Sequence, residues 1–100
     1  MLFILSGGAY NHRVTAYYCY ILQCADDSYY TGWTTNVQRR LQEHRAGRGS
    51  RYTRSRRPLE LVFVEEQSDR SSAMRRERAI KAMARKRKLA LIQSHTMPEY

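Results

Sequence analysis

Aromatic and aliphatic residues are concentrated in two short segments that a turn-forming stretch separates. Tyr17 to Gln23 combines aromatic residues with Ile21 and Leu22, which is typical of a β-strand. Residues 25–28 are alanine, two aspartates and serine, which favour a turn, and Tyr29 to Thr34 is again aromatic and rich in threonine. The pattern therefore predicts a β-hairpin.

After the hairpin the apolar positions take a helical spacing. Asn36 is a favourable helix N-cap, and Val37 and Leu41 lie four residues apart, so we expect a helix up to Arg45. Glycines at positions 47 and 49 end it. The basic residues 48–57 then predict a loop, which ends before Pro58.

The second half of the chain predicts one more strand and further helix. Residues 59–64 are apolar enough to form the central strand of a sheet. Residues 73–84 place alanine, methionine and isoleucine at intervals of three and four, which indicates a helix, and residues 85–92 continue it or start another. The expected fold class is α/β of the α+β kind, a small three-stranded antiparallel sheet flanked by helices in the order β-β-α-β-α, with an optional last helix.

The expected organisation is one domain with two short ends, because 100 residues leave little room for a second core. We assign residues 1–16 to an N-terminal extension, residues 17–93 to the domain and residues 94–100 to a tail broken by Pro98. No stretch approaches the ~20 apolar residues that a membrane span needs. Met1 to Leu5 is apolar but lacks a basic leader, so no export is expected.

The charge balance narrows the choice of partner. The chain has 18 Lys and Arg against 9 Asp and Glu, a net charge of +9. Most of the cations are arginines, which grip phosphates through two hydrogen bonds, so nucleic acid is the expected partner. A positive surface that only keeps the protein soluble is the alternative. Cys19 and Cys24 are too few for a zinc site and point to opposite faces, which favours a reduced, cytoplasmic protein without a disulfide.

Three polar residues stand out on the predicted helices. Arg40 and His44 share the apolar edge of the first helix, where an arginine needs an anionic partner or a bound phosphate unless its head group reaches solvent. Glu77 lies on the apolar stripe of the second helix and is the only acid between Arg70 and Lys88. Such a carboxylate suits a hard cation such as Mg²⁺, and a structural Glu–Arg pair is the alternative.

The hairpin places two tyrosines on one face. Tyr20 and Tyr30 can approach each other across the strand pair, and Gly32 leaves room above the sheet for a phosphate. Aromatic strand faces are also common in ordinary cores, so the tyrosines alone decide nothing.

Taken in order, these residues resemble the GIY-YIG nuclease domain. Tyr18-Cys19-Tyr20 stands for its first motif and Tyr30-Thr31-Gly32 for its second, followed by Arg40 and His44 on one helix and Glu77 on a later one. The likeness is greatest to small bacterial single-domain members of the YhbQ-like kind and extends to the Slx-type endonuclease domain. Tyr18, Cys19 and Thr31 depart from the motif letters at positions that serve backbone packing.

The resemblance implies a metal-dependent endonuclease that hydrolyses phosphodiester bonds in DNA, with a role in DNA repair or processing. By it, Tyr30 is the general base, Tyr20 orients the water or Tyr30, and Arg40 holds the scissile phosphate. His44 hydrogen-bonds Tyr30 or positions it, and Glu77 holds Mg²⁺ or Mn²⁺. The expected nucleic-acid-binding residues are Gly32, Arg48, Arg51, Tyr52, Arg54, Arg56, Arg57 and Lys81. A non-catalytic nucleic-acid-binding module of the same fold is the rival hypothesis, and it has no need of Glu77.

Overall fold

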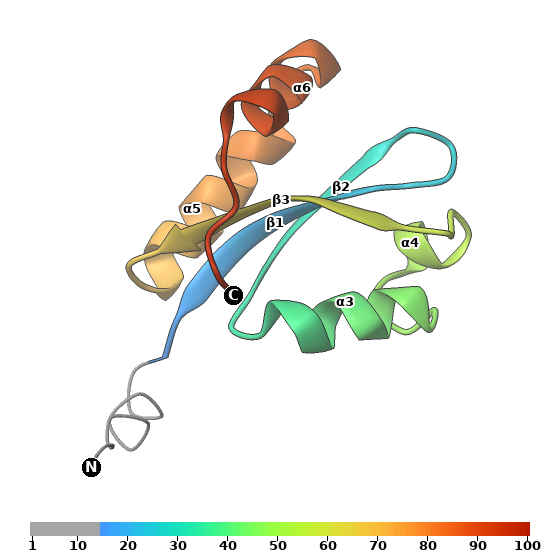
Figure 1. Ribbon diagram of the computed structural model, residues 1–100, viewed down its shortest axis with the longest axis horizontal. Helices are drawn as coiled ribbons and strands as arrows, with labels where there is room; N and C mark the ends of the chain where they lie inside the picture. Colours follow the sequence, from blue (N-terminus) through green and yellow to red (C-terminus); the bar gives the residue numbers. More distant parts are fainter. Residues whose placement is uncertain (1–14) are drawn as a thin grey trace.

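Three antiparallel strands form a sheet with helices on both faces (Figure 1). The computed structural model describes residues 15–100, so the predicted extension lies outside the described residues except for its last two. The strands are β1 (Tyr17–Gln23), β2 (Tyr29–Thr34) and β3 (Glu60–Gln67). The helices are α3 (Val37–Arg45), α4 (Arg51–Arg54), α5 (Arg70–Lys81) and α6 (Arg85–Ser94). The expected α+β order is confirmed.

The sheet order is β2-β1-β3, so β1 is the central strand. The expectation that the third strand lies at the centre is wrong. Residues 19–22 of β1 are all buried, and the strand pairs Tyr20 with Gly32 on one side and with Val64 on the other. Strand β3 is apolar only in its middle, since Glu60 and Glu66 are exposed at its ends. Edge strands are commonly charged in this way, which prevents pairing with other chains.

Two hydrophobic clusters lie on opposite faces of the sheet. One includes Tyr20, Leu22 and Val64 and packs against Val37 and Leu41 of α3. The other includes Cys19, Ile21 and Phe63 and packs against Ala73 and Ile80 of α5, with Leu91 and Ile92 of α6 at its margin. Alternate residues of β1 thus serve different faces. Each cluster needs its own helical cover, which explains the three-layer arrangement seen in Figure 1.

Side-chain caps define where the helices begin. Asn36 accepts a hydrogen bond from the amide of Arg39 in α3, and Asp69 accepts one from the amide of Ser72 in α5. The expected first helix is confirmed, whereas α5 begins three residues before the expected one and ends before Ala82, so that α6 is a separate helix.

The basic segment after α3 is not a continuous loop. It contains the short helix α4, for which Ser50 is the N-cap and accepts from the amide of Thr53. Cys19 and Cys24 are buried free thiols, as expected. None of the helices in the described part of the chain is long and apolar enough to cross a bilayer.

Candidate active site

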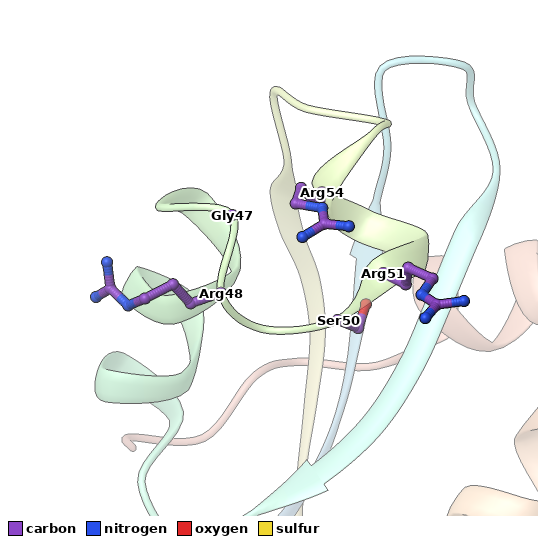
Figure 2. A pocket seen from close by; sticks show the side chains of 5 residues that line it. All are labelled: Gly47, Arg48, Ser50, Arg51 and Arg54. Atoms are coloured by element: carbon purple, nitrogen blue, oxygen red, sulfur yellow. The ribbon is translucent and has the colours of Figure 1, made fainter.

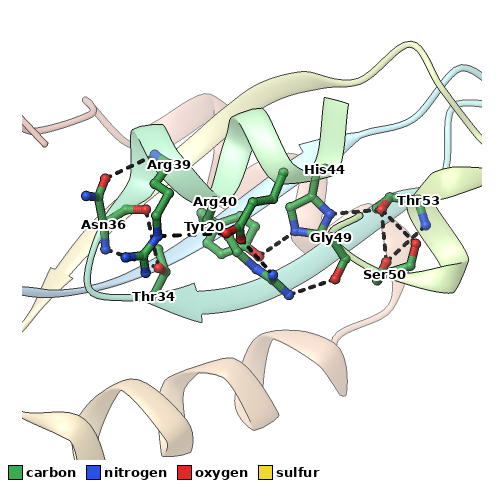
Figure 3. A network of polar contacts seen from close by, with 10 residues as sticks. Tyr20, Thr34, Asn36, Arg39, Arg40, His44, Gly49, Ser50 and Thr53 are labelled. Atoms are coloured by element: carbon green, nitrogen blue, oxygen red, sulfur yellow. Dashed lines mark hydrogen bonds and ion pairs between the residues drawn. The ribbon is translucent and has the colours of Figure 1, made fainter. Parts of the chain in front are cut away.

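Two buried residues, Tyr20 on β1 and His44 on α3, lie at the bottom of the candidate site (Figure 3). The Tyr20 hydroxyl lies 2.8 Å from His44 Nε2, and the two side chains belong to residues that are 3% and 0% exposed. Burial raises the pKa of Tyr20 well above its ordinary value, while the nearby Arg40 guanidinium opposes this rise. Tyr20 is therefore a protonated phenol that is held in place.

His44 uses both ring nitrogens inside the protein. Its Nδ1 lies 2.8 Å from Thr53 Oγ1, which in turn lies 2.9 Å from Ser50 Oγ. Burial and the charge of Arg40 lower the pKa of His44 to about 4, so the imidazole is neutral at pH 7. A neutral imidazole donates through one nitrogen and accepts through the other. A continuous hydrogen-bonded chain thus runs from Ser50 through Thr53 and His44 to Tyr20.

Arg40 lies one helical turn before His44 with its side chain 31% exposed. Its Nη1 donates to Glu43 Oε1 at 3.0 Å, and its Nη2 donates to the Gly49 carbonyl oxygen at 2.8 Å. Although partial burial acts in the opposite direction, the hydrogen bond to Glu43 and the proximity of Tyr20 raise the pKa of Arg40. Glu43 is therefore an anionic partner of Arg40.

Tyr30 of β2 completes the cluster. Its ring centroid lies 6.5 Å from that of Tyr20 and 5.1 Å from the His44 imidazole, which it meets edge to face. The side chain is only partly buried, and within the described residues its hydroxyl makes no hydrogen bond. The contact with His44 is thus between rings, whereas the hydrogen bond of His44 goes to Tyr20 rather than to Tyr30.

Two glycines allow the close packing of these rings. A Cβ atom on Gly32 would lie 2.5 Å from the Tyr20 hydroxyl oxygen, and one on Gly49 would lie 2.2 Å from His44 Nδ1. Both distances are too short for a real side chain. The space that we expected above Gly32 for a phosphate is filled by the Tyr20 ring.

Glu77 approaches from the opposite layer, since α5 covers the other face of the sheet. Its side chain is 21% exposed, and its carboxylate lies 3.6 Å from Lys81 Nζ. Its negative charge is among the smaller causes that raise the pKa of Tyr20, which places it within electrostatic range of the cluster. Lys81 thus partners Glu77 on α5, away from the basic loop.

The remaining predicted binding residues of the basic segment divide into three groups. Arg48, Arg51 and Arg54 line a pocket beside α4. Tyr52 stacks on Tyr30 with a centroid distance of 6.0 Å, and the Arg56 guanidinium covers the Tyr52 ring at 3.7 Å. By contrast, Arg57 donates to the carbonyl oxygens of Arg54 and Arg45, so its guanidinium links α3 and the end of α4.

A divalent metal would have one carboxylate to bind here. Within residues 15–100 no group of three or more His, Cys, Asp or Glu side chains could hold a metal ion. Mg²⁺ usually keeps several waters and takes one or two protein carboxylates, so the partly exposed Glu77 fits such an ion. A zinc site of four protein ligands does not fit.

Comparison with known proteins identifies the family. The family model described as the GIY-YIG catalytic domain matches residues 16–90. The chain belongs to the GIY-YIG catalytic domain family. UPF0213 proteins of Natronomonas pharaonis and Staphylococcus haemolyticus are 50% and 51% identical to it over 80 and 77 residues. These alignments cover 80% and 77% of the chain and 94% of each relative.

Two solved structures have the same fold. The solution NMR structure of a UPF0213 protein from Bacillus halodurans is 41% identical and has a TM-score of 0.54, covering 83% of this chain and 88% of that one. The solution NMR structure of a protein from E. faecalis is 34% identical and has a TM-score of 0.58, covering 87% and 97%. The GIY-YIG resemblance drawn from the motif residues is therefore confirmed.

Sequence reasoning missed three residues of this GIY-YIG site. Thr53 is fully buried and bonds His44, Ser50 caps α4 and bonds Thr53, and Glu43 pairs with Arg40. The spacing of Ser50 and Thr53 is that of a helix cap and its third helical residue, which could have indicated α4. Their link to His44 depends on tertiary folding, which no local pattern contains.

Proposed function

We propose that this protein is a metal-dependent endonuclease that hydrolyses phosphodiester bonds in DNA. The observation that carries the proposal is the meeting of Tyr20, Tyr30, Arg40 and His44 on one face of a GIY-YIG fold. These side chains offer a proton acceptor, a phosphate-binding cation and a fixed hydrogen-bond relay. The strong positive charge of the chain supports a polyanionic substrate.

In this proposal Tyr30 is the general base. Its hydroxyl has no hydrogen-bond partner within the described residues, whereas the Tyr20 hydroxyl is buried and occupied by His44. Tyr30 is therefore the phenol that an attacking water can reach. A phenol that gives up its proton to act as a base is an anion, and the Arg40 guanidinium is the cation beside the cluster that would stabilise it.

Arg40 would bind the scissile phosphate through its partly exposed guanidinium. The hydrogen bonds to Glu43 and Gly49 hold that group in one orientation, so little entropy is lost when the substrate binds. Charge that develops on the phosphate oxygens would then meet a fixed cation. Tyr20 and His44 have positioning roles, because their bond fixes the ring on which Tyr30 packs.

Glu77 would hold the divalent cation, Mg²⁺ or Mn²⁺, which supplies further neutralisation of phosphate charge and lowers the pKa of bound water. In this arrangement Lys81 must release the carboxylate, which its 3.6 Å separation and its exposed position permit.

A non-catalytic DNA-binding module is the second candidate function. The observation that favours it is the pairing of Glu77 with Lys81 and of Arg40 with Glu43, because both proposed ligands already have partners. The two functions differ in whether DNA is cut in the presence of a divalent metal.

The test is incubation of the full chain with single-stranded, duplex and branched DNA in Mg²⁺, in Mn²⁺ and in EDTA. We expect metal-dependent cleavage of at least one substrate and its loss in Glu77→Ala. Glu66→Ala is the matched control, since Glu66 is an exposed carboxylate on β3. Absence of cleavage in both metals, or equal cleavage by Glu77→Ala and the control, would rule out the enzyme and leave the binding module.

A further inference from the structure

A pocket rich in arginine opens beside the candidate site. It has a volume of about 390 Å³ and is lined by Gly47, Arg48, Ser50, Arg51 and Arg54. In Figure 2, Arg48 extends from the loop after α3, and Arg51 and Arg54 extend from α4, with Ser50 between them in the chain. We call this the arginine pocket. Among the described residues, three cations line it and no acid does.

The arginines of the pocket differ from Arg56 and Arg57 in having no side-chain partner within the described residues. Within residues 15–100, Arg48, Arg51 and Arg54 make no ion pair and no side-chain hydrogen bond, and all three are exposed. Arg56 by contrast pairs with Asp26 at 3.1 Å, and Arg57 donates to two carbonyl oxygens. The pocket therefore keeps its hydrogen-bond donors available for a ligand from outside.

The ligand class follows from these donors. A guanidinium matches a phosphate with two parallel hydrogen bonds, and the three guanidinium groups that line the pocket have no anionic partner within the described residues. A phosphate group is the anion that the proposed substrate carries at every nucleotide.

The arginine pocket is rigidly connected to the candidate active site. Its residue Ser50 is the outer end of the chain that runs through Thr53 and His44 to Tyr20. The same loop is bonded to Arg40 through the Gly49 carbonyl oxygen at 2.8 Å. The backbone of the loop that lines the pocket is thus hydrogen-bonded to Arg40, and the Ser50 side chain is linked to the candidate site.

We propose that the arginine pocket is a second phosphate site, which holds a backbone phosphate of the same strand beyond the scissile phosphate at Arg40. This inference rests on the proposed function and adds the substrate class. The substrate is a polynucleotide strand that continues past the cleaved bond along α4, not an isolated dinucleotide. Because this contact is made equally in the ground state and in the transition state, its loss raises KM and leaves kcat unchanged.

The first test measures binding without cleavage. A labelled single-stranded DNA oligonucleotide is titrated with the protein in EDTA over a range of salt concentrations. For Arg51→Ala/Arg54→Ala we expect weaker binding and a salt slope reduced by about 0.7 for each lost phosphate contact. Arg75→Ala/Arg78→Ala is the matched control, because it removes the same charge from exposed positions of α5 on the other face of the sheet.

The second test locates the anion. Inorganic phosphate is titrated into the isotopically labelled protein while the arginine side-chain resonances are followed by NMR. We expect saturable shifts at Arg48, Arg51 and Arg54, and their loss in the double variant. Even shifts over all exposed arginines, or an equal loss of DNA affinity in both double variants, would overturn the second site.

These outcomes are separate from those of the proposed function. Because binding is measured in EDTA, a protein that never cuts DNA can still show the arginine pocket. If the protein cuts DNA and its KM is unchanged in Arg51→Ala/Arg54→Ala, the second phosphate site is ruled out and the proposed nuclease activity stands.

Discussion

At the scale of single residues, the most unusual group is a histidine that is completely buried and neutral. His44 has a Tyr20 hydroxyl on one side and a Thr53 hydroxyl on the other, and Gly49 packs so closely that no other residue fits there. Its histidine identity is visible in the sequence, but its partners are nine and 24 positions away. The residue itself was predictable from the sequence, whereas the choice between a hydrogen bond to Tyr30 and a contact that positions Tyr30 was open. His44 contacts the Tyr30 ring and bonds the Tyr20 hydroxyl.

Burial of His44 makes folding stability depend on pH. Its folded pKa of about 4 lies below its ordinary value of 6.5, so the unfolded chain binds one more proton between these values. The free energy of unfolding should thus fall as the pH drops from 6.5 towards 4, by up to about 1.4 kcal/mol per pH unit. Urea unfolding at several pH values measures this. His44→Gln should show a smaller fall, and an identical fall in both proteins would contradict the neutral buried state.

Gly32 should be intolerant of any side chain. A Cβ atom there meets the Tyr20 hydroxyl oxygen at 2.5 Å and Cζ at 2.7 Å, so Gly32→Ala must displace a buried ring from His44. We expect a loss of about 1–3 kcal/mol in the free energy of unfolding, as for other overpacked sites. Denaturant unfolding measures the change, and a variant as stable as the wild type would show that the ring moves freely.

At the scale of elements, the sequence patterns predicted which segments form helices and strands better than they predicted the order of the strands in the sheet. The cap at Asn36 and the spacing of Val37 and Leu41 defined α3 correctly. Helix α4 was missed because a single turn of RYTR sequence has no apolar periodicity, and tertiary bonds from Thr53 to His44 stabilise it. Strand β3 was wrongly expected at the centre of the sheet, where β1 lies. An apolar run in the sequence does not distinguish a central strand from an edge strand whose middle is buried and whose ends are charged.

Helix α4 contributes a stacked column to the site. The Tyr52 ring stacks on the Tyr30 ring and is covered by the Arg56 guanidinium, and Arg56 is anchored to Asp26 in the hairpin turn. Tyr52→Ala should loosen Tyr30 and lower the cleavage rate about tenfold, within the ~100-fold that a 1 Å misplacement can cost. Tyr52→Phe keeps the ring and should keep the rate. Single-turnover cleavage measures both rates. Equal rates in Tyr52→Ala and wild type would show that Tyr52 does not hold Tyr30 in its active position.

At the scale of the whole molecule, the candidate residues come from the helical layers on both faces of the sheet. The layer of α3 and α4 carries Arg40, His44 and the arginine pocket, whereas α5 and α6 cover the other face and contribute Glu77 (Figure 1). The net charge of +9 predicted a polyanionic partner but could not show which face binds it. Charge counts are sums over the chain, and only the fold shows which arginines have partners.

The central claim is that Tyr30 acts as the base of a DNA-cleaving site. The most direct measurement compares single-turnover cleavage by Tyr30→Phe and Tyr29→Phe, which each lose one hydroxyl from adjacent residues of β2. Tyr29 packs in the cluster on the other face, so it is the matched control. We expect the cleavage rate to fall about 10²–10⁴-fold in Tyr30→Phe and to change little in Tyr29→Phe. Equal rates in the two variants would contradict it.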